Sequence, residues 1–73
     1  MIQKLEETIK EVSPDIELGR DLIDQIDSLD MVLLVEQMEK DFSISIEPED
    51  IDEKNFKTFE DLAKLLKRYV DEV

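Results

Sequence analysis

The strongest constraint on the fold is a stripe of apolar residues with helical spacing in the middle of the chain. Its members occupy positions i, i+3, i+4, i+7 and i+11 of a helix and are Met31, Leu34, Val35, Met38 and Phe42. Residues with this spacing share one face of an α-helix. Asp27 or Ser28 is the natural N-cap, and Asp30 in the first turn complements the helix dipole. The pattern predicts a helix from about Ser28 to Asp41.

Two further helices are predicted, one on each side of the central helix. The first covers about residues 2–12, where apolar residues again recur at helical spacing: Ile2, Leu5, Ile9 and Val12. Ser13-Pro14 ends this helix, because the residue before a proline is pushed out of the α region. The last helix begins at Thr58, with Asp61 completing an imperfect capping box, and continues to about Val70.

The segment 43–57 has a less regular pattern. Ile44 and Ile46 alternate with polar residues as in a strand, but two such residues without a pairing partner make a weak strand. Pro48 suits the first position of a short helical turn that ends near Glu53. We therefore predict an all-α fold, a small four-helix bundle of three main helices plus a short third helix.

The composition argues against several kinds of function. The 73 residues are expected to form one domain, residues 1–73, and they include no histidine and no cysteine. The commonest general base and the commonest metal ligand are both missing, as is a thiolate. We therefore expect neither an enzyme nor a metal site. A calcium-binding EF-hand is rejected because Asp21, Asp24 and Asp27 are spaced by three and no glycine stands where that loop turns.

The chain is strongly acidic. It has 21 acidic and 9 basic residues and a net charge of −12, so it should repel nucleic acid and be drawn to basic patches on other proteins. No apolar run approaches the roughly 18 residues that read as a membrane span. The N-terminal residues show no apolar region of a signal peptide. We expect a cytoplasmic monomer that has no membrane span and binds no nucleic acid.

Ser28 stands at the start of the central helix with no group nearby to activate its hydroxyl. The nearest ionisable residues in sequence are Asp24, Asp27 and Asp30, which are anions at neutral pH and have no need of a proton. The ordinary role of such a serine is to cap the helix. A serine that cannot attack can still be modified by another enzyme.

The sequence around Ser28 resembles the acyl carrier protein family. The resemblance lies in DSLDMVLLVEQMEKDF, residues 27–42, and ISIEPED, residues 44–50. The first three residues are similar to the attachment signature of the family, Pro48 stands at the start of its short third helix, and Thr58 at the start of its fourth. Gln25 stands where the family usually has a glycine. The resemblance extends from Leu18 to Val70.

This resemblance implies a cofactor and a set of partners. An external, Mg²⁺-dependent phosphopantetheinyl transferase would move 4'-phosphopantetheine from coenzyme A to Ser28. The thiol that the sequence lacks would then arrive on a flexible arm. The protein would carry acyl intermediates, as in fatty acid biosynthesis, between acyl-transferring, condensing or adenylating enzymes. Asp27 would either cap the helix or help to hold the Mg²⁺, and both roles stay open.

The resemblance also implies two groups of site residues. Exposed residues of the central helix, and acidic residues after it, would dock basic patches of the partner enzymes: Leu29, Asp30, Val32, Glu36, Glu39, Glu47 and Asp50. The inward residues form the core and would have a second role in sheltering a short acyl chain: Met31, Leu34, Val35, Met38, Phe42, Ile46, Phe59 and Leu62.

Two alternatives remain open. The cargo of such a carrier can be an aminoacyl or peptidyl group instead of an acyl chain. A protein of a different class, an acidic interaction module or DNA mimic, explains the net charge but not the residues around Ser28.

Overall fold

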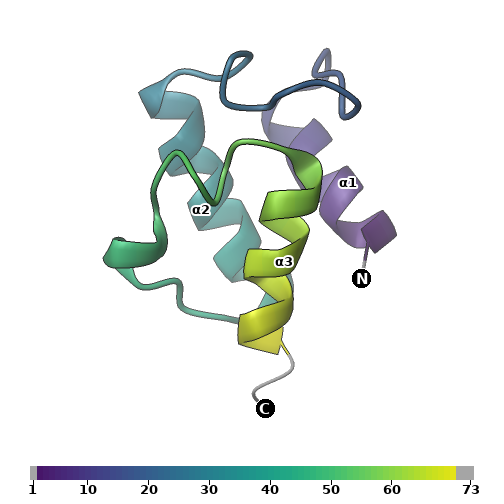
Figure 1. Ribbon diagram of the computed structural model, residues 1–73. Coiled ribbons are helices and arrows are strands. Elements are labelled where there is room, and N and C mark those ends of the chain that lie inside the picture. Colours follow the sequence, from purple (N-terminus) through teal and green to yellow (C-terminus); the bar gives the residue numbers. More distant parts are fainter. Residues whose placement is uncertain (1, 71–73) are drawn as a thin grey trace.

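The computed structural model describes residues 2–70, and this range contains three α-helices (Figure 1). The helices enclose an apolar core. α1 spans Ile2–Val12, α2 spans Ser28–Phe42 and α3 spans Phe59–Val70. A 3-10 turn, η1, spans Pro48–Asp50. The described chain contains no strand, so the predicted all-α fold is confirmed.

The direction of the helices determines which ends lie together. α2 and α3 run the same way, and α1 runs opposite to them (Figure 1). Residues 13–27 cross one end of the molecule from α1 to the start of α2. Residues 43–58 return from the far end of α2 to the start of α3 (Figure 1). The beginnings of α2 and α3 therefore lie at the same end, together with the 13–27 loop.

α1 has the bounds that its apolar spacing predicts. Leu5 and Ile9 are buried, Val12 is half-buried, and the chain leaves the helix at Ser13, whose N–H donates to the carbonyl of Ile9 at 2.9 Å. Ile2 was expected on the buried face but is 47% exposed. Residues of a first helical turn lie at the edge of a core, where fewer neighbours cover them.

α2 is capped at both ends. Asp27 is its N-cap, and Ser43 is its C-cap with φ 54, in the left-handed conformation that commonly ends helices. The carbonyl of Glu39 in the last turn accepts the N–H of Ser43 and also the N–H of Ile44, the latter at 3.1 Å. The helix ends at Phe42, one residue beyond the predicted Asp41.

The predicted third helix is shorter than expected. We predicted a turn from Pro48 to about Glu53, but the 3-10 turn ends at Asp50. Asn55 takes over the bonding beyond that point: its Nδ2 donates to the carbonyl of Asp50 at 2.9 Å, and its backbone N–H donates to Oδ1 of Asp52 at 2.9 Å. The chain then forms a separate turn, in which the N–H of Phe56 donates to the carbonyl of Asp52 at 3.2 Å, and η1 is not continued.

The core draws residues from all three helices and from both connections. Its buried apolar side chains are Leu5, Ile9, Ile16, Leu22, Leu34, Val35, Met38, Ile46, Phe56, Leu62, Leu65 and Leu66. The connecting segments therefore do not lie loosely over the helices. Each is held by its own buried residues, Ile16 and Leu22 in one, Ile46 and Phe56 in the other.

Candidate functional site

Ser28 is the first residue of α2, and its side chain is exposed. Its hydroxyl makes no hydrogen bond to any other residue in the range 2–70, and the backbone N–H groups of Ser28 and Leu29 have no acceptor in that part of the chain. A helix N-terminus carries a partial positive charge and unpaired donors. The serine therefore presents a free hydroxyl beside groups that suit an anion.

Asp27 performs the capping that was predicted for Asp27 or Ser28. Its Oδ1 accepts the N–H of Asp30 at 2.8 Å, and its carbonyl accepts the N–H of Met31 at 3.0 Å. Asp27 is exposed, and only one of its two carboxylate oxygens, Oδ1, takes part in the cap. The predicted contact with Mg²⁺ remains a prediction.

A groove of about 350 Å³ lies beside Ser28. One side comes from the end of the 13–27 loop and the start of α2, and the other comes from the loop after η1. Its apolar lining residues are Ile23, Ile26, Met31 and Ile51, and its polar ones are Asp27, Ser28, Asp52 and Glu53. Among the residues predicted to shelter an acyl chain, Met31 lines this groove.

The remaining residues of that predicted set lie deeper or elsewhere. Leu34, Val35, Met38, Ile46 and Leu62 are buried in the core, and Phe42 and Phe59 are half-buried against it. They serve as packing in this structure. Ile23, Ile26 and Ile51 were not predicted as groove residues, because they stand in irregular segments where apolar spacing does not tell which way a side chain faces.

The outward face of α2 carries exposed apolar side chains next to Ser28. Leu29 is 66% exposed, Val32 54% and Leu33 44%, and Glu36 is exposed on the following turn. We call these four residues the outer α2 face. Leu29, Val32 and Glu36 were predicted from sequence. Leu33 was not among the predicted residues, although its position four residues after Leu29 places it on the same side of the helix.

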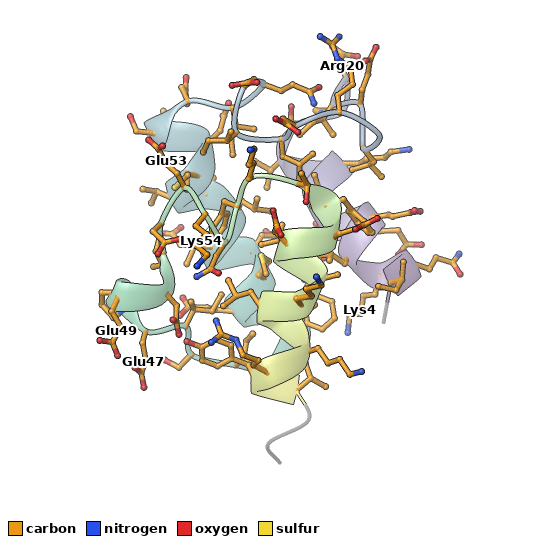
Figure 2. All side chains as sticks on the ribbon, viewed as in Figure 1. Lys4, Arg20, Glu47, Glu49, Glu53 and Lys54 are labelled. Atoms are coloured by element: carbon orange, nitrogen blue, oxygen red, sulfur yellow. The ribbon has the colours of Figure 1, made fainter. Side chains whose placement is uncertain are left out.

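Of the other residues predicted for docking, Asp30 and Glu39 are less exposed than the outer α2 face, and Glu47 is exposed. Asp30 is half-buried. Glu39 is half-buried, and its Oε2 accepts the N–H of the buried Ile46 at 2.8 Å. Glu47 is exposed, and Figure 2 shows it with Glu49 on the outer side of the segment between α2 and α3. Sequence reasoning did not anticipate the structural role of Glu39, because its partner is seven residues away.

Asp50, also predicted for docking, is half-buried and bonded to α3. The hydroxyl of Tyr69 donates to Oδ2 of Asp50 and accepts the N–H of Glu47 at 3.1 Å. Nη2 of Arg68 lies 3.7 Å from Oδ1 of Asp50. Burial, and then the hydrogen bond to Asp50, raises the pKa of Tyr69 above its ordinary value. These contacts attach η1 to the last helix.

Two further findings bear on the kind of site this is. Within residues 2–70, no group of three or more acidic side chains is arranged to hold a metal ion. None of the helices in the described range has the length and apolar character needed to cross a membrane.

A model of the phosphopantetheine attachment site family matches residues 1–66. The chain belongs to the phosphopantetheine-bearing carrier proteins. The match includes α1, α2 and η1 in full and most of α3. Comparison with curated proteins and comparison with solved structures gave no significant match.

Membership of this carrier family confirms the predicted cofactor, because the matched domain is the site of covalent 4'-phosphopantetheine attachment. The local structure fits the group. Ser28 offers an exposed hydroxyl, and the free N–H groups of Ser28 and Leu29 suit a phosphodiester. When bound, the arm supplies the thiol that the sequence of this carrier does not encode. A carrier of this kind requires a phosphopantetheinyl transferase and biosynthetic enzymes as partners.

Proposed function

We propose that this carrier protein bears 4'-phosphopantetheine on Ser28 and carries acyl groups as thioesters on the thiol of that arm. The observation that supports this most directly is the free, exposed hydroxyl of Ser28 at the N-terminus of α2. Because Asp27 caps the helix, Ser28 can be modified without loss of the capping hydrogen bond. Ser28 is exposed, its hydroxyl makes no hydrogen bond to another described residue, and a hydroxyl can carry a phosphodiester.

The protein itself is proposed to have no enzymatic activity. Ser28 has no base within the described structure that takes its proton: the chain contains no histidine, and the adjoining ionisable groups are the carboxylates of Asp27 and Asp30. The transferase must therefore supply the base that deprotonates the hydroxyl. Coenzyme A supplies the phosphopantetheine group: the serine oxygen bonds to its phosphorus, the pyrophosphate bond breaks, and adenosine 3',5'-bisphosphate leaves.

The outer α2 face is proposed to bind partner enzymes. Leu29, Val32 and Leu33 offer apolar contact area beside Ser28, and Glu36 adds a carboxylate to the same face. A fitting partner has an apolar pocket bordered by arginine or lysine side chains. The net charge of −12 speeds encounters with such a basic surface at low salt, and added salt screens this attraction and removes the acceleration.

We propose an acyl chain as the cargo, in a pathway of the fatty acid type. The support is the groove beside Ser28, whose apolar lining comes from Ile23, Ile26, Met31 and Ile51. A short aliphatic chain gains from leaving water in such a groove. An aminoacyl cargo is the alternative, since Asp52 and Glu53 on the same groove suit an ammonium group.

The attachment is tested by intact-mass measurement. The protein is incubated with a promiscuous phosphopantetheinyl transferase, coenzyme A and Mg²⁺. We expect one added phosphopantetheine unit in the wild type and in Ser45→Ala, which removes another exposed serine. Ser28→Ala should remain unmodified. An unmodified wild type, with a transferase that modifies a known carrier in parallel, would favour an acidic interaction module.

The cargo is tested after loading. Carriers bearing a hexanoyl, an octanoyl or an alanyl thioester are compared for melting temperature and for the rate of thioester hydrolysis. An acyl carrier of the proposed kind is expected to melt higher with the aliphatic chains than in the unacylated holo form, because the groove covers them. Stabilisation by the alanyl group alone would assign the groove to an aminoacyl cargo.

A further inference from the structure

The loop before Ser28 has little regular structure of its own. Fifteen residues, 13–27, separate α1 from α2. The backbone hydrogen bonds formed within this loop are Ile16 N–H to Ser13, Arg20 N–H to Glu17 and Gln25 N–H to Leu22. A segment with so few bonds needs other contacts to take one conformation, because each ordered residue loses backbone entropy.

The side chain of Gln25 supplies such contacts. Its Oε1 accepts the N–H of Glu17 at 2.8 Å, and its Nε2 donates to the carbonyl of Glu17 at 2.9 Å and to the carbonyl of Asp21 at 3.1 Å. One amide thus closes the loop on itself across eight residues. We call these three bonds the Gln25 clamp. A terminal amide suits this task, because it offers an acceptor and two donors at once.

The other side of the same loop is attached to the segment before α3. The carbonyl of Lys57 accepts the N–H of Leu22 at 2.6 Å and the N–H of Ile23 at 3.3 Å. The buried side chain of Leu22 anchors this point. Residues 22–25 are therefore held from two directions, by Lys57 and by the Gln25 clamp.

The held segment leads directly to the attachment site. Ile23 and Ile26 line the groove beside Ser28, and Ser28 follows Gln25 by three residues. A transferase that reaches the Ser28 hydroxyl must also contact the chain next to it. When this stretch of chain already has one conformation before binding, no binding free energy is lost in ordering it.

We propose that Gln25 is a positioning residue for modification of Ser28: the Gln25 clamp orders the loop that the transferase must bind. This inference rests on the proposed function, in which Ser28 is the attachment residue. Gln25 does not touch the reacting atoms. Its effect is therefore on the KM of the transferase for the carrier, and not on kcat.

The test uses the full chain and steady-state kinetics of loading by one transferase with coenzyme A and Mg²⁺. Gln25→Ala removes all three bonds of the clamp. Gln25→Glu keeps the size and the acceptor but removes both donors, and brings a carboxylate against two carbonyl oxygens. Thr8→Val is the control, because it removes a buried hydrogen bond to Asp41, between α1 and α2, and leaves the loop untouched. All are compared at a temperature at which circular dichroism shows them folded.

We expect both Gln25 variants to raise KM about tenfold, as the ordering of one or two backbone residues implies, with kcat unchanged. Amide exchange at Glu17 should accelerate in Gln25→Ala. Thr8→Val should keep the wild-type KM. An unchanged KM in either Gln25 variant, a loss confined to kcat, or an equal rise in Thr8→Val overturns the role of Gln25 while loading at Ser28 stands. A wild type that is not loaded overturns both proposals.

Discussion

Oδ1 of Asp27 accepts the backbone N–H of Asp30 at 2.8 Å, so the hydroxyl of the neighbouring Ser28 is not needed to cap the helix. A helix start needs a side-chain acceptor at its N-cap, and Asp27 supplies one. Ser28, at the next position, keeps its hydroxyl free and exposed. Because Asp27 caps the helix and Ser28 does not, the start of α2 can be stable while the Ser28 hydroxyl stays accessible.

Substitution of Asp27 separates its capping role from its predicted role at Mg²⁺. Asp27→Ala is expected to lower the free energy of unfolding by about 1 kcal/mol, because the N–H of Asp30 loses its acceptor. Asp27→Asn should stay within about 0.5 kcal/mol of the wild type, since asparagine caps equally well. If the carboxylate helps to hold Mg²⁺, the asparagine variant is loaded about tenfold more slowly. Urea denaturation and a time course of intact mass measure the two effects; loading at the wild-type rate restricts Asp27 to capping.

Leu33 is expected to act in partner binding and not in folding. Leu33→Ala should change the free energy of unfolding by less than about 0.5 kcal/mol, as is usual at exposed positions, and should raise the KM of an acyl-transferring partner. Leu34→Ala, the adjacent residue, is buried and should cost about 2–5 kcal/mol. Urea denaturation compares the pair. A large loss of stability in Leu33→Ala would place that side chain in the core.

The contact between Glu39 and Ile46 predicts a difference between two glutamates of α2. Glu39→Ala leaves the N–H of the buried Ile46 without its acceptor and should lower the free energy of unfolding by about 1–3 kcal/mol. Glu36→Ala removes an exposed carboxylate from the same helix and should stay within about 0.5 kcal/mol of the wild type. Equal effects in urea denaturation would refute the role assigned to Glu39.

Tyr69 is expected to make stability depend on pH in the alkaline range. Its pKa in the folded state is raised above the ordinary value of 10.0, so the folded protein holds the phenol proton more tightly than the unfolded chain. The stabilisation is complete below pH 10 and is lost as pH rises through the folded pKa. Tyr69→Phe should cost about 1–2 kcal/mol at neutral pH, through the bonds to Glu47 and Asp50.

The measurement for Tyr69 is a series of urea denaturations from pH 7 to pH 11. The difference between wild type and Tyr69→Phe should be constant up to about pH 10 and narrow above it, because only the wild type loses stability from this group. A difference that is the same at every pH would show that the Tyr69 proton is bound equally in both states.

The helices were largely predictable, because each is defined by relations between residues within a few positions. Leu5 and Ile9 in α1, and Leu34, Val35 and Met38 in α2, are buried as their spacing predicts. Thr58 caps α3 as predicted, with its Oγ1 accepting the N–H of Asp61 at 3.1 Å. The short turn η1 was predicted too long, because the bonds that Asn55 makes to Asp50 and Asp52 after it are not visible in apolar spacing.

The sequence by itself determined that the chain is all-α and that α2 starts near Ser28, since these depend on local spacing. It also lacks cysteine, so the thiol that the family resemblance implies has to come from outside. The tertiary structure decided how the connecting segments are held and what lies beside Ser28. Gln25 meets Glu17, Glu39 meets Ile46, and Tyr69 meets Asp50 only after the chain has folded. Ile51 reaches the groove for the same reason. Such contacts join residues that are not related by helical or strand periodicity. In irregular segments the direction of a side chain depends on how the helices pack around it, and local spacing does not determine this.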